Sequence, residues 1–254
     1  MSFAKALLAN PELILRHRNI FLLSHMRANT SLFGHLIGSH PLVEGYYEMH
    51  IGYYSWKSLW RQKLRHFANH NVKPGARWMF DKVLHDGHHV ATSLLMRDTS
   101  RTIIMLRAPE QSVKSLVALY RKHSPQLPEA TPEGATRYYV DRLAALADTA
   151  GAIGPRYFYL DAENLISRTD VTLAELSTWL GFDTPIPSQY DTFENTGQGN
   201  TGDHSSRLKS GKVNRTRSDY SDIELTSAQQ AAAEEAYQRH REQIIAGAAQ
   251  HATA

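Results

Sequence analysis

The sequence predicts an α/β fold with a central, mostly parallel sheet and helices on both faces. Four short apolar runs, at 20–23, 77–82, 101–107 and 156–160, have the length and composition of buried strands. Segments with apolar residues at helical spacing separate them, and this alternation is typical of a parallel sheet. Ligands of such sheets bind at the carboxyl ends of the strands. The residues that follow each run are therefore the candidates for a functional site.

Composition narrows the class of protein. The chain has 254 residues, of which 42% are hydrophobic and 21% charged, so it is globular and long enough for a sizeable core. Its net charge of +3 and pI of about 9.0 suit an anionic ligand but give little support for nucleic acid. The absence of cysteine excludes disulfides and thiolate metal sites and fits a reducing compartment.

Targeting and membrane segments are not expected. The apolar stretch 6–9 is too short for the core of a signal peptide, and Asn10, Pro11 and Glu12 interrupt it. No run reaches the roughly 18 apolar residues of a transmembrane helix. We therefore expect a cytoplasmic protein without a membrane anchor.

The first strand leads into a compact polar loop at 24–31, and apolar residues at helical spacing follow at 32–37. The first N–H groups of a helix have no partner within the helix, so such a loop can bind phosphate or sulfate. Arg27 would add a positive charge, and Thr30 and Ser31 would add hydroxyl donors. The same residues also fit an ordinary turn in which Thr30 or Ser31 caps the helix. These residues alone leave both interpretations open.

A second candidate loop follows the run at 101–107. Arg107 ends the strand, Pro109 suits the first turn of a helix, and that helix extends over 110–123. An arginine in this position can clamp a phosphate with two hydrogen bonds. Ser115 lies on the same helix and would add a hydroxyl.

Both loops resemble the phosphate motifs of sulfotransferases that use 3′-phosphoadenosine 5′-phosphosulfate (PAPS). The 5′-phosphosulfate loop of that family matches Arg27-Ala28-Asn29-Thr30-Ser31, with Asn29 in the position of the usual glycine. Asparagine adopts left-handed backbone more readily than most residues, so the loop can keep its shape. The 3′-phosphate motif matches Arg107, Pro109 and Ser115. No Walker A or G-x-G-x-x-G sequence is present.

The resemblance extends to His40-Pro41 and Glu48, which are similar to a motif of the tyrosylprotein and carbohydrate sulfotransferase-like branch. It implies that Glu48 is the catalytic base, with His50 as the reserve candidate. It also implies that Lys82, at the end of a strand, contacts the sulfuryl group. The late basic segment would contact the 3′-phosphate through Arg207, Lys209 and Gly211.

The resemblance also implies a single P-loop-NTPase-like domain over 1–254, with its core at about 19–215. A final helix is predicted at 226–247, with Thr226 as its N-cap. PAPS would be the cosubstrate, and the reaction needs no metal. Asp161 and Glu163 belong to a structural block of the family, so we expect them to pack and cap rather than catalyse.

Two further clusters have more than one interpretation. The spacing of Trp56 and Trp60 favours core packing over stacking on nucleic acid. The tyrosines on either side of Glu48 suggest an aromatic acceptor pocket, and they are Tyr46, Tyr47, Tyr53 and Tyr54. His85, His88 and His89 could bind a metal. The chain has no cysteine and no H-E-x-x-H motif, so a loop near the active site or an ordinary surface position is the favoured interpretation. We therefore expect no metal ligands.

The function predicted is transfer of a sulfuryl group from PAPS to a hydroxyl or amine on a small-molecule, saccharide or lipid acceptor. One rival is a P-loop nucleotide kinase, which the missing Walker lysine disfavours. The other is a degenerate family member that binds an adenosine phosphate without catalysis, which Asn29 in place of glycine favours. The acceptor and the oligomeric state are not determined by these residues.

Overall fold

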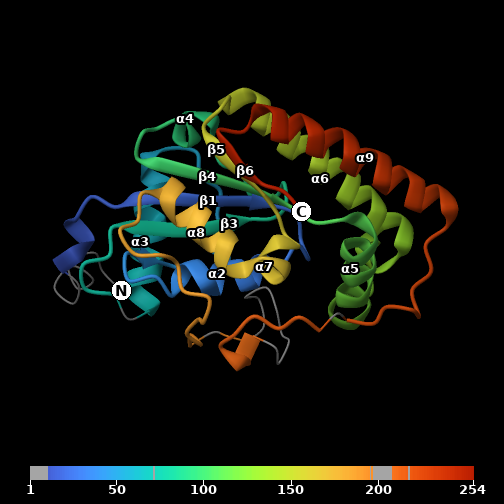
Figure 1. Cartoon of the computed structure of the whole chain (residues 1–254), viewed down its shortest axis with the longest axis horizontal. Helices are drawn as coiled ribbons and strands as arrows, with labels where there is room; N and C mark the ends of the chain where they lie inside the picture. The colour runs from blue at the N-terminus through green and yellow to red at the C-terminus, as the bar shows by residue number, and fades with distance from the viewer. Residues whose placement is uncertain (1–10, 71, 195, 197–207, 217) are drawn as a thin grey trace.

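A parallel six-stranded sheet forms the centre of the molecule (Figure 1). The structure is a computed structural model that describes residues 11–70, 72–194, 196, 208–216 and 218–254. The strand order is β2-β3-β1-β4-β5-β6, and every pairing is parallel. The strands are β1 (Arg18–Ser24), β2 (Val43–Glu44), β3 (Trp78–Val83), β4 (Ser100–Leu106), β5 (Tyr157–Asp161) and β6 (Gln250–Ala252). The predicted parallel sheet is confirmed, and two short edge strands, β2 and β6, extend it.

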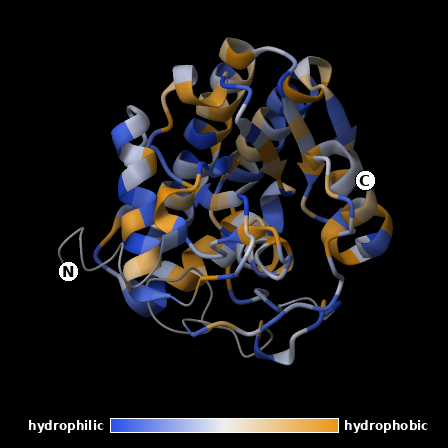
Figure 2. Cartoon of the chain, turned by 90° about the vertical axis from the view of Figure 1, so that its left-hand side faces the viewer, coloured by the Kyte–Doolittle hydropathy of each residue, from blue (hydrophilic) through white to orange (hydrophobic). Residues whose placement is uncertain are grey.

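Side chains of the inner strands alternate between two cores. In β1, Phe21 and Leu23 face one core while Ile20 and Leu22 face the other. Because both faces are buried, the strands are continuous apolar runs. The described helices that give fully buried residues to the first core are α4 (Thr92–Leu95), α5 (Pro109–His123), α6 (Pro132–Ile153) and α9 (Ser227–Gly247). Three contribute to the second, namely α2 (Thr30–Gly38), α7 (Asn164–Ser167) and α8 (Thr169–Leu180). Hydrophilic and hydrophobic residues alternate along the helices (Figure 2), as expected when one side of each helix packs against the sheet and the other faces solvent.

Helix α3 (Trp56–Asn69) packs beside β3, where Phe67 meets Met79 and Leu13 of a 3-10 turn, η1 (Pro11–Ile14). Trp60 is partly buried against this cluster, as its spacing predicts. The prediction is wrong for Trp56, which is 59% exposed because it begins the helix, ahead of the turns that contact the sheet.

The C-terminal helix α9 begins as predicted, with Thr226 as its N-cap in a capping box with Gln229. Its Arg241 forms an ion pair with the buried carboxylate of Asp161, which also accepts a hydrogen bond from the Ala254 N–H at 2.8 Å. Asp161 is therefore a packing residue, as expected. No helix within the described ranges is both long and apolar enough to cross a bilayer.

The direction of chain winding changes between β1 and β4. The helix after β1, α2, covers one face of the sheet, whereas the helix after β4, α5, covers the other. The loops after these adjacent strands therefore diverge. Ligands of open α/β sheets bind in the crevice that such a switch creates.

Candidate active site

A cavity of about 690 Å³ opens at the carboxyl ends of the strands. Its volume is in the range of small-molecule and cofactor sites. Most of the predicted site residues line it, namely Arg27, Asn29, Thr30, Ser31, Glu48, His50, Arg107 and Ser115. Residues far apart in the sequence thus share one wall, as their positions after strand ends predict.

The loop after β1 has the conformation that an anion-binding turn needs. Asn29 is left-handed, with φ 58° and ψ 20°, which confirms that asparagine can adopt the backbone expected of glycine here. Asn29 is itself the N-cap of α2, so the interpretation of Thr30 or Ser31 as the cap is wrong. Its side chain makes no capping bond and instead donates to the Ala162 carbonyl at 3.3 Å. The start of α2 therefore faces the cavity without a side-chain cap. Ala28 is fully buried behind this wall.

Hydrogen bonds join the two predicted phosphate motifs directly. Arg27 Nε donates to Ser115 Oγ at 2.8 Å, and an Arg107 guanidinium nitrogen donates to the Arg27 carbonyl at 2.9 Å. Arg27 from the loop after β1, Arg107 from the loop after β4 and Ser115 of α5 thus form one cluster on the cavity wall, which we call the arginine cluster. Its charge suits a phosphate group.

Buried groups hold the backbone of Arg107 on both sides. The Arg107 N–H donates to His25 Nε2 at 3.0 Å, and the Tyr139 hydroxyl donates to the Arg107 carbonyl at 2.7 Å. Burial lowers the pKa of His25 to about 3, so the ring is neutral and can accept through Nε2. Its other nitrogen, Nδ1, donates to the Met26 carbonyl at 2.9 Å. The arginine cluster is therefore held in place before any ligand binds.

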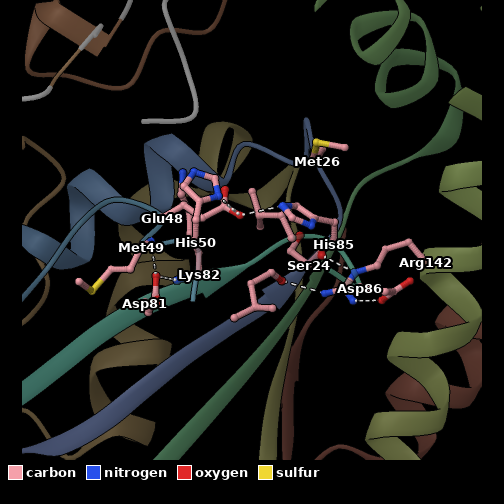
Figure 3. Close-up of polar contacts among 12 residues, drawn as sticks. Ser24, Met26, Glu48, Met49, His50, Asp81, Lys82, His85, Asp86 and Arg142 are labelled. Atoms are coloured by element: carbon pink, nitrogen blue, oxygen red, sulfur yellow. Dashed lines mark hydrogen bonds and ion pairs between the residues drawn. The ribbon is translucent and has the colours of Figure 1, made fainter. Parts of the chain in front are cut away.

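Glu48 lies on the same cavity, in the segment between β2 and α3. Its carboxyl group is 7% exposed, and one oxygen lies 3.5 Å from both His50 Nδ1 and His85 Nε2 (Figure 3). The adjacent Met49 N–H donates to Asp81 at 3.1 Å, which fixes this segment to β3. A buried carboxylate bordered by imidazoles has the chemistry of a proton acceptor.

Lys82 lies directly behind the wall. It is 1% exposed and does not line the cavity, but its Nζ donates to Ser31 Oγ at 3.2 Å. Its charge therefore lies beneath the first turn of α2, where it adds to the positive end of the helix dipole.

The predicted tyrosine pocket is wrong, because none of its four tyrosines lines the cavity. The Tyr53 hydroxyl is fully buried and donates to Asp81 at 2.5 Å. Tyr54 is 64% exposed, and Tyr46 stacks on Phe193. The apolar residues of the wall include Leu119 and Tyr120 of α5 and Leu127 of the loop that follows it.

The late basic segment reaches the cavity through residues other than the predicted ones. Arg207 lies outside the described residues, while Lys209 and Gly211 are described but do not line the wall. Arg215 and Tyr220 do, and the Tyr220 hydroxyl lies 2.9 Å from Ser115 Oγ. Arg215 belongs to the basic run visible in the sequence. Nothing in the sequence distinguishes Tyr220, because its role depends on a contact with α5.

Glu163 also lines the cavity, and its carboxylate accepts the N–H of Ala108, the N-cap of α5, at 3.1 Å. This contact agrees with the predicted capping role. The negative charge also complements the N-terminus of α5.

Asp81 provides a test of how the Glu48 segment is held. Burial raises the pKa of its carboxyl group to about 7, against about 4 in an unfolded chain. The folded state therefore binds this proton more tightly, and the resulting stability is lost as the pH rises from about 4 through about 7. Relative to Asp81→Asn, we expect the wild-type free energy of unfolding to fall by up to about 1.4 kcal/mol per pH unit in that window. Urea denaturation between pH 4.5 and 8 measures this difference, and parallel curves would contradict the prediction.

Comparisons with known proteins find similarity at the level of structure. No protein-family model and no curated protein sequence matches the chain. A sulfotransferase domain from the curacin biosynthetic pathway superposes with a TM-score of 0.63 at 16% identity, over 89% of this chain and 97% of that one. The sulfotransferase domain of the Synechococcus PCC 7002 olefin synthase gives 0.58 at 16%, over 89% and 95%. The mouse sulfotransferase SULT7A1, complexed with PAP, gives 0.52 at 13%, over 92% and 89%.

Proposed function

The chain has the fold of the sulfotransferases, and from this premise we propose that it transfers a sulfuryl group from PAPS to a hydroxyl or amine acceptor. One observation carries the proposal. The members of the two phosphate motifs meet on one cavity wall, where Arg27 donates to Ser115 at 2.8 Å and Arg107 donates to the Arg27 carbonyl. Binding of PAP by a structural neighbour supports the same donor here.

The proposed donor site uses the two ends of the arginine cluster. Arg107 and Ser115 would bind the 3′-phosphate, with Tyr220 beside Ser115 as a further hydroxyl. Arg27 and the start of α2 would bind the 5′-phosphosulfate, because unpaired helical N–H groups favour anions. Holding the donor at both phosphates orients its sulfur for in-line attack.

The proposed transfer step needs one base and one source of positive charge. Glu48 takes the proton from the acceptor as the acceptor oxygen or nitrogen bonds to sulfur. The bond between sulfur and the 5′-phosphate oxygen breaks at the same time, and the electron pair leaves with 3′-phosphoadenosine 5′-phosphate. Lys82, acting beneath Ser31, stabilises the negative charge that develops on the leaving group.

Calorimetry with 3′-phosphoadenosine 5′-phosphate tests the donor site. We expect binding without Mg²⁺, and we expect Arg107→Ala to weaken it by about thirtyfold or more, equivalent to about 2 kcal/mol, because it removes a charge from the ligand's phosphate. Arg101→Ala is the matched control, since Arg101 lies near the start of β4, at the end of the strand away from Arg107, and does not line the cavity.

The other outcomes distinguish the rival functions. Absence of binding would exclude the PAPS assignment. Preference for ATP with Mg²⁺ would exclude it as well and would favour a nucleotide kinase. Binding without turnover across a panel of alcohols, phenols and amines would favour a non-catalytic adenosine-phosphate binder.

A further inference from the structure

Three histidines converge on the cavity beside Glu48. His50, His85 and His88 each offer one ring nitrogen, and these nitrogens lie within 4.8 Å of one another. They come from two separate segments, the one that follows β2 and the one that follows β3. Figure 3 shows the side chains of Glu48 and His85 directed toward one another, with His50 beside Glu48. His85, His88 and His89 are neighbours in the sequence, but only the fold brings His50 beside His85 and His88.

The spacing of these groups fits a tetrahedral metal ion. Ligand atoms about 2.1 Å from a tetrahedral zinc lie about 3.4 Å apart. Glu48 Oε1 lies 3.5 Å from His50 Nδ1 and 3.5 Å from His85 Nε2, so two edges of such a tetrahedron already exist. His88 can supply a further ligand after a small side-chain rotation, because it lies in a partly exposed turn.

A second observation points to a cation in the same place. Glu48 Oε1 is buried and accepts no hydrogen bond from any described group. A buried carboxylate oxygen that accepts no hydrogen bond is costly, and a bound cation would remove that cost. The site thus combines a buried carboxyl oxygen that accepts no hydrogen bond with three imidazole rings that can each offer a nitrogen ligand.

The surrounding structure holds the ligands in place. His50 has a left-handed backbone, with φ 51°, which is uncommon for a residue other than glycine and clusters at functional sites. Arg142 donates to the carbonyls of Ser24 and Val83 and forms an ion pair with Asp86, which fixes the start of the His85 segment (Figure 3). A site supported in this way needs little rearrangement to bind.

We propose that His50, His85 and His88, with the carboxylate of Glu48, form a binding site for a divalent transition metal such as Zn²⁺. Imidazole ligands select zinc and its neighbours over Mg²⁺ and Ca²⁺, which prefer oxygen. The site exists independently of sulfuryl transfer. If the proposed function also holds, an occupied site would withdraw Glu48 from the acceptor, and the metal would inhibit transfer.

Metal binding is measured without PAPS or any acceptor, on the full chain produced without a histidine tag and stripped with EDTA. Calorimetry should give one Zn²⁺ per chain and no binding of Mg²⁺. Co²⁺ should give the strong visible absorption of a tetrahedral ion. We expect His85→Ala and His88→Ala each to weaken Zn²⁺ binding at least tenfold and to abolish the Co²⁺ absorption.

His89→Ala is the matched control, because His89 is adjacent in sequence, exposed, and not part of the group. We expect it to bind Zn²⁺ as the wild type does. Thermal melting by circular dichroism checks that each variant is folded. Absence of Zn²⁺ binding by the wild type, or equal binding by the His85→Ala, His88→Ala and His89→Ala variants, would overturn the proposal. Neither result would affect binding of 3′-phosphoadenosine 5′-phosphate, so the two proposals fail separately.

Discussion

Replacing Glu48 by glutamine is expected to lower the turnover number by about 10²- to 10⁴-fold, the range by which general bases accelerate reactions. Glutamine has the same shape as glutamate but cannot take a proton from the acceptor. Affinity for 3′-phosphoadenosine 5′-phosphate should change little, since the arginine cluster that would bind it is formed by other residues. Transfer of ³⁵S from PAPS, with the acceptor found by screening, measures turnover. Calorimetry measures the affinity.

Two control variants test whether the loss of turnover is specific to Glu48. His50→Gln tests the reserve base, and we expect a smaller loss because His50 is 43% exposed whereas Glu48 is 7% exposed. Glu163→Gln removes a second carboxyl group that lines the cavity but keeps an oxygen for the Ala108 N–H, so most of the activity should remain. A larger loss in His50→Gln than in Glu48→Gln would reassign the base to His50.

Much of the fold follows from local sequence. The strands that form the centre of the sheet are apolar because they are buried on both faces, so they stand out as runs. The edge strands β2 and β6 cannot be recognised in the sequence, because two or three residues are too few to form an apolar run. Their pairing depends on what lies beside them. Val43 pairs with Trp78, and His251 pairs with Tyr159.

Some residues of the candidate site could likewise be predicted from local sequence, and others could not. Arg27 and Arg107 could be predicted because each follows a strand, and parallel strands end on one edge of the sheet. The assignment of Tyr53 to a pocket failed because its hydroxyl donates to the buried carboxyl group of Asp81 in β3, at 2.5 Å. Tyr220 and His85 acquire their roles through contacts with residues distant in the sequence. Such contacts depend on the packing of loops, which leaves no periodic signal.

Lys82 is the second residue for which we expect a large effect. Lys82→Met keeps the length of the side chain and removes its charge from beneath Ser31. If that charge stabilises the leaving group in the transition state, turnover should fall by about 10²- to 10³-fold, the cost of removing one preorganised donor. The free energy of unfolding should stay the same or rise, because an ammonium that is 1% exposed has lost its hydration.

The control for this substitution is Lys63→Met. Lys63 is also buried, at 7% exposed, and its Nζ donates to the Leu15 carbonyl at 2.7 Å, away from the cavity. Burial lowers the pKa of Lys63 to about 8. Lys63 therefore shares the burial of Lys82 but not its position beside the cavity. Turnover per folded molecule should therefore be unchanged in Lys63→Met. If Lys82→Met also kept its turnover, Lys82 would be only a structural support for Ser31, and the charge that stabilises the leaving group would have to come from Arg27 and the first turn of α2.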